Sequence, residues 1–377
     1  MNTTWRQCTI GDVCDTISNT YNSNAQQVVL INTSDVLEGK VLNHIYIPNE
    51  NLKGQFKKTF EEGDILYSEI RPQNKRYAYI DFAPINYIAS TKLMVIRNKN
   101  IVKSKYLYYF LQSDKIISEL QMLAETRSGT FPQITFNELS KLSIKIPPLP
   151  EQDRIISILD SICKKIDINQ QINDNLEEQA KALFKSWFVD FDRNEWVHYE
   201  LGDITLITAG GDRPSKYTNK KTIECHVPIY SNGIDNEGLY GYTDVAKIHE
   251  ESITISARGT IGYVCLRLEP YVPIVRLISI IPNKKELSAK YLYLWALTQN
   301  ITGTGTTQQQ LTVPIFRKTP ISIPSDTKLK QFNSIADPLF SQIESNKKEN
   351  IKLSTLRDTL LPKLMSGELS VEEVSLD

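Results

Sequence analysis

Apolar residues recur at alternating intervals of four and three along residues 155–187 and again along residues 332–364. This spacing is the seam of a coiled-coil helix, in which the a and d positions of each heptad face a partner helix. The first seam consists of Ile155, Leu159, Ile162, Ile166, Asn169, Asn173, Leu176, Ala180, Leu183 and Trp187. The second seam lies 177 residues later and consists of Phe332, Ala336, Leu339, Ile343, Asn346, Asn350, Leu353, Arg357, Leu360 and Leu364. The pattern therefore predicts two long helices of one design.

Both seams contain two asparagines at the same places, Asn169 and Asn173 in the first and Asn346 and Asn350 in the second. A polar seam residue lowers stability but fixes register and partner. The duplicated asparagines therefore indicate that the two helices pair with each other, and we assign these four residues to the register of the coiled coil. The alternative is that each helix packs as an amphipathic helix on its own domain.

Pro338 interrupts the second helical pattern. Proline removes one hydrogen bond inside a helix. We therefore expect the second helix to kink at Pro338 or to begin at Asp337, with Pro338 in its first turn.

Outside the helices, short runs rich in Val, Ile, Tyr and Thr alternate with Gly, Pro and Asn, which is typical of short strands and turns. Residues 65–70 and 77–80 flank a polar loop, and residues 253–256 and 262–266 flank another. Residues 106–111 and 291–297 have helical apolar spacing and are expected to pack on a sheet.

These patterns form an internal repeat. Gly11-Asp12 returns as Gly202-Asp203, Lys105-Tyr106-Leu107-Tyr108 as Lys290-Tyr291-Leu292-Tyr293, and Ile146-Pro147 as Ile323-Pro324. The order is collinear, so the chain consists of two tandem copies of one unit. We expect an α+β fold with two tandem mixed α/β domains, at residues 1–150 and 192–325, a central helix at 151–191, and a C-terminal helix and tail at 326–377.

The order of the segments sets the direction of the helices. The first helix leaves the first domain and delivers the second, so a second helix that packs along it must run antiparallel. The first seam spans about 48 Å at about 1.5 Å per residue. Two similar domains held farther apart than one duplex turn, about 34 Å, suit two DNA half-sites with a fixed spacer, although other extended ligands fit this geometry too.

The charge balance changes this interpretation only in part. The chain has 377 residues, of which 43 are basic and 44 acidic, for a net charge of −1. Self-sufficient nucleic-acid binders are usually clearly basic. Residues 1–150 and 197–325 carry net charges of +3 and +2, whereas residues 151–196 and 326–377 carry −4 and −2. A balance this weak indicates that a partner supplies much of the grip on the DNA backbone.

The sequence lacks the common motifs of catalytic, nucleotide-binding and metal-binding sites. It contains no Asn-Pro-Pro methylase tetrapeptide, no phosphate-binding G-x-x-x-x-G-K-[ST] string and no histidine spacing typical of a metal site. The five cysteines form no C-x-x-C pair. There is no long apolar run and no basic region followed by an apolar run at the start. We expect no catalytic site, cofactor or metal, and a cytoplasmic protein without a membrane span.

Three segments resemble recurring regions of Type I restriction-modification DNA specificity subunits. They are I-P-P-L-P-E-Q-D-R-I at residues 146–155, L-F-K-S-W-F-V-D-F at 183–191 and L-P-K-L-M-S-G-E-L at 361–369. The order of domains and helices also matches that family over nearly the whole chain. One departure is Ile323-Pro324-Ser325-Asp326, which lacks the P-L-x-E-Q continuation found after Pro147.

The resemblance implies a non-catalytic subunit that recognises a bipartite sequence in double-stranded DNA through two target-recognition domains. It also implies binding to two modification (methyltransferase) subunits and, in the full complex, to restriction (motor and nuclease) subunits. The helices and their flanks are then expected to contact the modification subunit, including Trp187, Phe188, Leu364 and Gly367.

Side chains that match base edges gather in four turn-rich segments. In the first domain they are Arg71, Gln73, Asn74, Lys75 and Arg76, followed by Arg127, Ser128, Thr130 and Gln133. In the second domain they are Arg213, Ser215, Lys216, Tyr217 and Asn219, followed by Arg258, Thr260, Gln308, Gln309 and Gln310. We expect most of these segments to face DNA, although each residue taken singly also fits a solvated turn. The rival interpretation is a structural adaptor whose rods bind helices and whose heads bind protein or carbohydrate.

Overall fold

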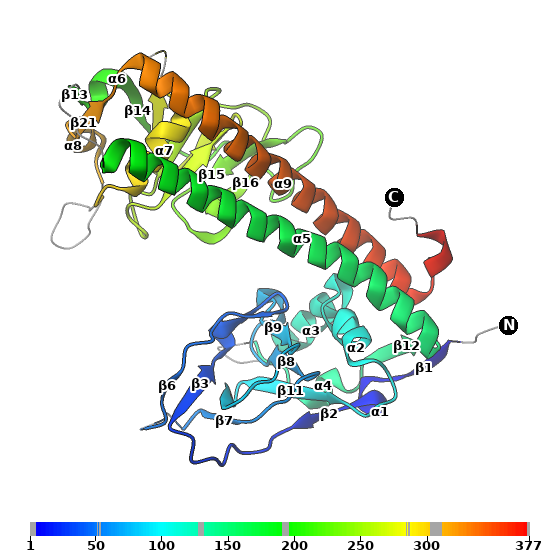
Figure 1. The fold of residues 1–377 in the computed structure, drawn as a ribbon. Coiled ribbons are helices and arrows are strands. Elements are labelled where there is room, and N and C mark those ends of the chain that lie inside the picture. Colours follow the sequence, from blue (N-terminus) through cyan, green and yellow to red (C-terminus); the bar gives the residue numbers. More distant parts are fainter. Residues whose placement is uncertain are drawn as a thin grey trace. The chain divides into compact units, whose positions relative to one another are not determined.

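The computed structural model describes residues 5–374 apart from 51, 53, 127–131, 191–195, 284, 286 and 302–310. The chain divides into two units (Figure 1). One comprises residues 1–168 and 349–377, and the other residues 169–348. Each unit holds one globular part, which we call a head, and one half of each long helix. The first head is residues 5–148 and the second head is residues 196–325.

The main sheet of the first head is antiparallel and has the strand order β2-β11-β8-β9. Its strands are β2 (Cys14–Ile17), β11 (Leu93–Asn98), β8 (Ile65–Ser68) and β9 (Tyr77–Tyr79). A second sheet, ordered β6-β3-β10-β7, consists of β6 (Ile47–Pro48), β3 (Gln27–Ile31), β10 (Tyr87–Ser90) and β7 (Phe56–Lys58). Two further pairs join β1 (Arg6–Thr9) to β12 (Ser143–Ile146) and β4 (Val36–Leu37) to β5 (Lys40–Val41).

The second head repeats this plan. Its main sheet has the order β14-β20-β17-β18, with β14 (Thr205–Ala209), β20 (Ile278–Pro282), β17 (Ser252–Ile255) and β18 (Val264–Arg267). The smaller sheet is β16 (Leu239–Thr243), β15 (Val227–Tyr230) and β19 (Val272–Pro273), and β13 (Val197–Glu200) pairs with β21 (Pro320–Ile323). The main sheets thus agree strand for strand, which confirms the tandem α+β fold.

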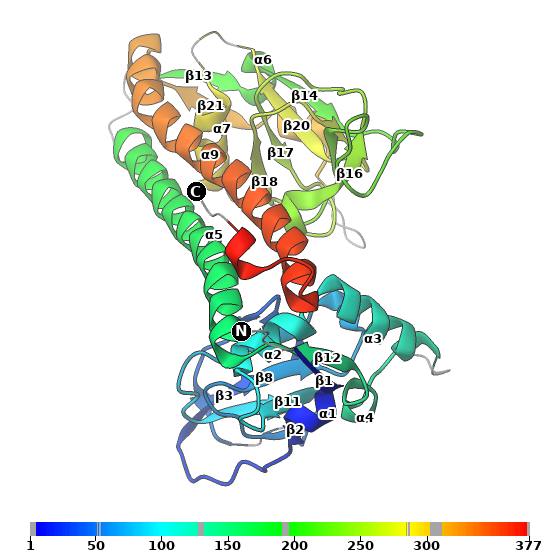
Figure 2. The same ribbon diagram turned by 90° about the vertical axis from the view of Figure 1, so that its right-hand side faces the viewer.

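Each head buries one aromatic helix between its main sheet and the long helices. In the first head this is α2 (Ser104–Leu111; Figure 2). Its Tyr106 shares a core with Ile65 of the sheet and Leu159 of the long helix. In the second head it is α7 (Ala289–Leu297; Figure 1). Its Tyr291 packs in the same way. The remaining helices of the heads are α1 (Ile10–Val13), α3 (Asp114–Thr126), α4 (Phe136–Leu139), α6 (Leu201–Ile204) and α8 (Val313–Arg317).

The same ion pair fixes both aromatic helices to the long helices. Lys105 of α2 lies 2.7 Å from Asp160, and Lys290 of α7 lies 3.0 Å from Asp337. The two lysines are repeat equivalents, and the two aspartates are 177 residues apart, as the seams are.

The long helices are α5 (Leu149–Phe184), extended by a π-helical turn at Lys185–Val189, and α9 (Asp326–Ser366). In the first unit, the beginning of α5 packs on the end of α9, with Ile155 and Leu364 in one core. In the second unit, the end of α5 packs on the beginning of α9, with Phe184 and Phe332 in one core. The two helices are therefore antiparallel, as the segment order predicted.

All twenty predicted seam positions lie in the described part of the chain, and all are buried or half-buried. In α9, Phe340 and Leu361 are more buried than the neighbouring seam positions Leu339 and Leu360. The pattern also shifts near the end of α5. Phe184 and Phe188 are 3% and 2% exposed, whereas Leu183 and Trp187 are half-buried. Here the helix faces α7 as well as α9, since Phe188 contacts Tyr291 and Phe332 at ring distances of 5.1 and 5.0 Å. The π-helical turn accompanies this change of face.

The expectation that the second helix begins at Asp337 is wrong, because α9 begins at Asp326 and passes through Pro338. Proline leaves the carbonyl of Ser334 without its helical hydrogen bond. Both Ser334 and Pro338 are exposed, so water can satisfy that carbonyl. The buried neighbours Ala336 and Phe340 supply the packing that keeps the helix continuous.

Candidate nucleic-acid interface

Both heads place an arginine at the same end of the main sheet. Arg71 is the third residue after β8, and Arg258 is the third residue after β17. The last residue of each strand pairs with the first residue of the neighbouring strand, Ser68 with Leu93 and Ile255 with Ile278. The repeat therefore delivers one arginine to an equivalent loop in each head.

A second basic residue precedes the neighbouring strand in each head. Lys92 comes directly before β11, and Arg276 lies two residues before β20. In the first head, the amide of Glu69 donates to the carbonyl of Lys92 (3.0 Å), which holds the two segments together. We call Arg71 with Lys92, and Arg258 with Arg276, the basic pairs. Because they lie at the ends of paired strands, a rigid sheet positions both members.

The loop that carries Arg71 has an unusual backbone. Arg71 and Lys75 have φ angles of +45° and +52°, and they enclose a single 3-10 turn at Pro72–Asn74. Side chains other than glycine rarely adopt this region, and such residues cluster at functional sites. Pro72 is buried, and the amide of Gln73 donates to Oε1 of Gln121 (3.2 Å). The surrounding structure therefore keeps this loop in its strained shape.

The same loop joins two of the segments predicted from sequence. The amide of Arg71 donates to the carbonyl of Pro132 (3.1 Å), and Ile70 forms a bridge with Gln133. Lys92 donates from Nζ to Oε1 of Gln133 (3.3 Å). Gln133 therefore lies beside the first basic pair. The predicted residues Arg127, Ser128 and Thr130 lie outside the described residues.

The other predicted residues of this loop have different surroundings. Gln73 and Asn74 are exposed. Lys75 forms an ion pair with Asp114 at 3.4 Å. Arg76 turns away from the loop, since its Nη1 donates to the carbonyl of Ser34 at 3.1 Å.

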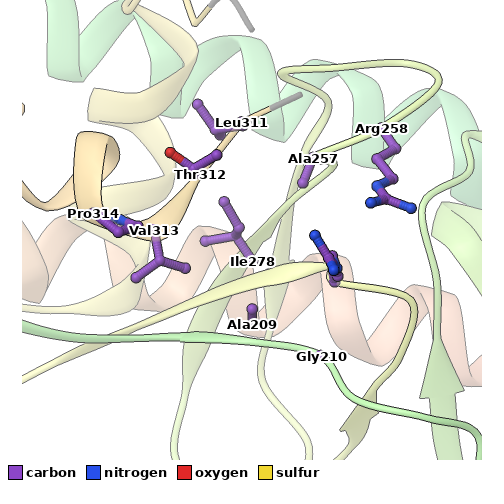
Figure 3. Close-up of a pocket in the computed structure, with 10 residues that line it drawn as sticks. Ala209, Gly210, Ala257, Arg258, Ile278, Leu311, Thr312, Val313 and Pro314 are labelled. Carbon is purple, nitrogen blue, oxygen red and sulfur yellow. The ribbon is translucent and has the colours of Figure 1, made fainter. Parts of the chain in front are cut away.

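In the second head, the basic pair lines a cavity of about 380 Å³ (Figure 3). The other lining residues are Ala209, Gly210, Ala257, Ile278, Leu311, Thr312, Val313 and Pro314. In Figure 3, Arg258 lies on the side opposite Thr312, Val313 and Pro314. The cavity thus has apolar walls and two guanidinium groups.

A strained turn positions Arg276 at the edge of this cavity. Val275 and Arg276 have φ angles of +53° and +61°, and a β-branched residue in this region is a clear outlier. Their amides donate to the carbonyls of Gly211 and Gly210, both at 2.9 Å. A Cβ on Gly210 would lie 2.7 Å from the amide nitrogen of Ile274, so only glycine fits this close approach. The Gly210-Gly211 loop therefore determines where Arg276 lies.

Arg213 is held by two tyrosines, one in its own loop and one in β16. Its guanidinium carbon lies 4.0 Å from the ring centre of Tyr217, and its Nη1 donates to the hydroxyl of Tyr240 at 3.1 Å. Both contacts restrict an exposed arginine before any ligand arrives. Lys216 is paired with Glu224 and Asp244 at 3.2 and 3.3 Å.

Three further predicted residues of the second head, Ser215, Asn219 and Thr260, are exposed. The predicted residues Gln308, Gln309 and Gln310 lie outside the described residues. Lys92 and Arg276 were not among the residues predicted from the sequence. Arg276 does leave a signal, because it is the charged residue within the otherwise apolar stretch 271–281.

The seam asparagines are buried or half-buried. Within the second unit, Asn346 donates from Nδ2 to Oδ1 of Asn173 at 2.8 Å. Within the first unit, Asn350 donates from Nδ2 to the carbonyl of Ile166 at 3.3 Å. Asn169 is 1% exposed.

The four residues expected to contact a modification subunit mostly serve the chain's own core. Phe188 and Leu364 are 2% and 0% exposed, and Trp187 is half-buried. Gly367 ends α9 with φ +73°, where the amide of Glu368 donates to the carbonyl of Lys363 (3.0 Å). Contact of these segments with a partner stays a prediction.

Within the residues that the structure describes, no group of three or more His, Cys, Asp or Glu side chains could hold a metal ion. In the same part of the chain, no helix is both long and apolar enough to cross a bilayer.

Comparison with known proteins gives consistent results. The family model of the Type I restriction modification DNA specificity domain matches residues 2–178 and again residues 193–355. The HindI Type I restriction enzyme specificity subunit of Haemophilus influenzae is 33% identical, over 97% of this chain and 99% of that protein. The MjaIX specificity subunit of Methanocaldococcus jannaschii is 29% identical, over 78% and 77%. The crystal structure of a Type I restriction-modification S subunit from M. genitalium has a similar fold, with a TM-score of 0.53 at 18% identity over 97% and 96% of the two chains. These matches confirm the resemblance and the two-copy organisation.

Proposed function

Since the chain belongs to the Type I restriction modification DNA specificity family, we propose that it reads a split sequence in double-stranded DNA, one half with each head, as a non-catalytic specificity subunit. The domain limits expected from sequence, at residues 150, 191 and 325, divide it into two target-recognition domains and two spacer helices.

The observation that carries this proposal is the duplicated basic pair. Arg71 with Lys92, and Arg258 with Arg276, occupy equivalent strand ends in the two heads. Arginine and lysine are the side chains that most often contact guanine and DNA phosphates. Strained turns hold Arg71 in the first head and Arg276 in the second, as is common at binding sites. Each head therefore presents one preorganised basic site.

The chain's net charge of −1 supports a role within a complex. So weak a balance releases few counterions, and other subunits must add phosphate contacts. We assign this role to two modification subunits, joined by restriction subunits in the full assembly, in the cytoplasm. Exposed apolar side chains on the long helices, Ile172 on α5 and Ile351 on α9, are suited to contacts with partner helices.

Quantitative DNA binding by the complex with its modification subunits tests this proposal. Replacing Arg258 or Arg276 by Ala should weaken binding and lower the salt dependence of log K by about one unit per lost phosphate contact. The matched control is Lys318→Ala. Lys318 is exposed in the same head but lies next to α6, at the opposite end of β14 from Gly210. Unchanged affinity and salt slope in both arginine variants would refute the proposed interface.

A further inference from the structure

A buried arginine lies at the end of β18 in the second head. Arg267 is 3% exposed, and its guanidinium carbon lies 3.5 Å from the ring centre of Tyr230. Its Nε donates to the hydroxyl of Thr254 at 3.0 Å, while Nη1 and Nη2 donate to the side chain and the carbonyl of Glu237 at 3.2 and 2.6 Å. A buried charge is tolerated only when it is paired and hydrogen-bonded in this way. Arg267 therefore holds Glu237 in one position.

The backbone around Glu237 is equally constrained. Asn236 and Glu237 have φ angles of +47° and +55°, and Gly238 follows at +80°. A Cβ on Gly238 would lie 2.3 Å from the carbonyl oxygen of Ser231. The amide of Ser231 donates to the carbonyl of Gly238 at 2.8 Å. The turn thus has little freedom to move its carboxylate.

The carboxylate of Glu237 reaches beyond the head to a long helix. Its Oε1 accepts a hydrogen bond from Nζ of Lys347 on α9 at 2.7 Å. Burial alone would lower the pKa of Lys347, but the nearby carboxylates, Glu237 first and then Glu344, together outweigh it, and the pKa is raised. The next residue, Lys348, pairs with Glu269 of the same head at 2.8 Å.

These pairs lie apart from the contacts that α7 makes with α9. Those contacts include the pair of Lys290 and Asp337 at 3.0 Å, the hydrogen bond from Ser288 to Asn333 at 2.7 Å and the packing of Tyr293 on Phe340. Asp337 and Lys347 are ten residues apart, or about 15 Å along a helix. One attachment permits a head to pivot on a helix, whereas two separated attachments fix its angle.

The first head has only a weaker form of this contact. After its own Glu38-Gly39 turn, Lys40 lies 2.5 Å from Asp167 of α5. Both side chains are well exposed, at 62% and 43%, so solvent screens the pair. In the second head, Glu237 and Lys347 are 42% and 43% exposed, and the difference is that the buried Arg267 also holds Glu237.

We propose that Glu237 is a positioning residue that, through Lys347, fixes the angle of the second head on α9 and thereby the number of base pairs allowed between the two half-sites. This inference rests on the proposed reading of a split target. Glu237 need not touch DNA, because it acts on the direction in which the head presents the basic pair of Arg258 and Arg276.

The test uses the complex with modification subunits and DNA duplexes whose half-sites are separated by the native spacer or by one base pair more or fewer. The native spacer comes from mapping methylated motifs in cells. Lys347→Met removes the contact with Glu237 and a longer one, at 3.8 Å, with Glu344 on the same helix, and leaves Arg267 and Glu237 paired, so the head keeps its fold. Glu237→Gln removes the charge at the centre of the network. Lys347→Arg keeps the cation, and Lys352→Met, at an exposed site on α9, is the control.

In Lys347→Met and Glu237→Gln, the preference for the native spacer should fall by about threefold, as expected for an ion pair of this kind. Lys347→Arg and Lys352→Met should keep the preference of the unsubstituted chain. Thermal unfolding of each variant separates this effect from a general loss of stability, which would lower binding to all duplexes alike. An unchanged preference in both Lys347→Met and Glu237→Gln would overturn the role of Glu237 while leaving the proposed function intact. Failure of the unsubstituted complex to bind any split target would overturn both.

Discussion

Asn346 on α9 donates a hydrogen bond to Asn173 on α5 over 2.8 Å, and the two side chains are 5% and 4% exposed. Within the described part of the chain, Nδ2 of Asn173 has no hydrogen-bond partner. A buried polar pair that is incompletely satisfied lowers stability. The asparagine pair instead fixes the register of α5 against α9, since only one alignment of the helices brings these amides together.

Substitutions at this pair should show how the hydrogen bond affects the stability of the chain. Asn346→Leu alone leaves both polar atoms of Asn173 buried without a partner, so the free energy of unfolding should fall by about 1–3 kcal/mol. Replacing Asn173 and Asn346 together by Leu should recover that loss, because neither of these two positions then holds a buried polar atom without a partner. Urea unfolding of the single and double variants measures this. A single variant as stable as the unsubstituted chain would show that the hydrogen bond contributes nothing.

Pro338 offers a stabilising change. It is exposed within a continuous helix, and alanine is favoured over proline there by up to about 3 kcal/mol. Pro338→Ala restores an amide that can donate to the carbonyl of Ser334, so the midpoint of urea unfolding should rise. Ser334→Ala, at an exposed position one turn earlier, should change it little. A lower midpoint for Pro338→Ala would mean that the helix depends on the proline.

The sequence was sufficient for the features that depend on local pattern and chain order. Seam spacing predicts both long helices, and the repeated motifs predict two like domains. The antiparallel pairing follows because the second helix must return along the first. Of the two alternatives at Pro338, a start at Asp337 is wrong, because the rules for proline in isolated helices ignore the packing of Ala336 and Phe340, which outweighs one lost hydrogen bond.

The candidate site was predictable only in part. Arg71 and Arg258 stand in polar loops between two apolar runs, so their type and place in the sequence identify them. Lys92 and Arg276 become neighbours of those arginines only through strand pairing across the sheet. The positive φ of Val275 depends on contacts with Gly210 and Gly211, which no local rule supplies.

Two adjacent glycines give a matched test of the cavity. A Cβ on Gly210 would meet backbone atoms at 2.7 Å, whereas one on Gly211 would meet only Nζ of Lys247 at 3.5 Å. Gly210→Ala should therefore cost about 1–3 kcal/mol of stability through overpacking. It should also weaken DNA binding by displacing Arg276. Gly211→Ala should leave both properties unchanged in unfolding and binding assays. Equal effects of the two substitutions would contradict the close approach at Gly210.

Glu344 should make stability depend on pH. Burial raises the pKa of its carboxyl, and Lys347 only partly opposes this. A raised pKa means that the folded chain binds this proton more tightly than the unfolded chain does. The stabilisation is therefore complete below the unfolded-state pKa, about 4.3, and is lost as the pH rises through the folded-state value.

Gln mimics the protonated form of Glu344 at every pH. Glu344→Gln should therefore be more stable than the unsubstituted chain at neutral pH, and the difference should shrink as the solution is acidified. Chemical unfolding across a pH series measures the difference. A variant that is less stable at neutral pH would show that the ionised carboxylate is stabilising.

The central claim is that each head reads one half of a split DNA target. Exchanging residues 1–145 for the equivalent segment of another family member, followed by mapping of methylated motifs in cells, tests it most directly. We predict that one half of the motif changes while the other half and the spacer stay the same. A motif that is unchanged, or that changes in both halves, would contradict the claim.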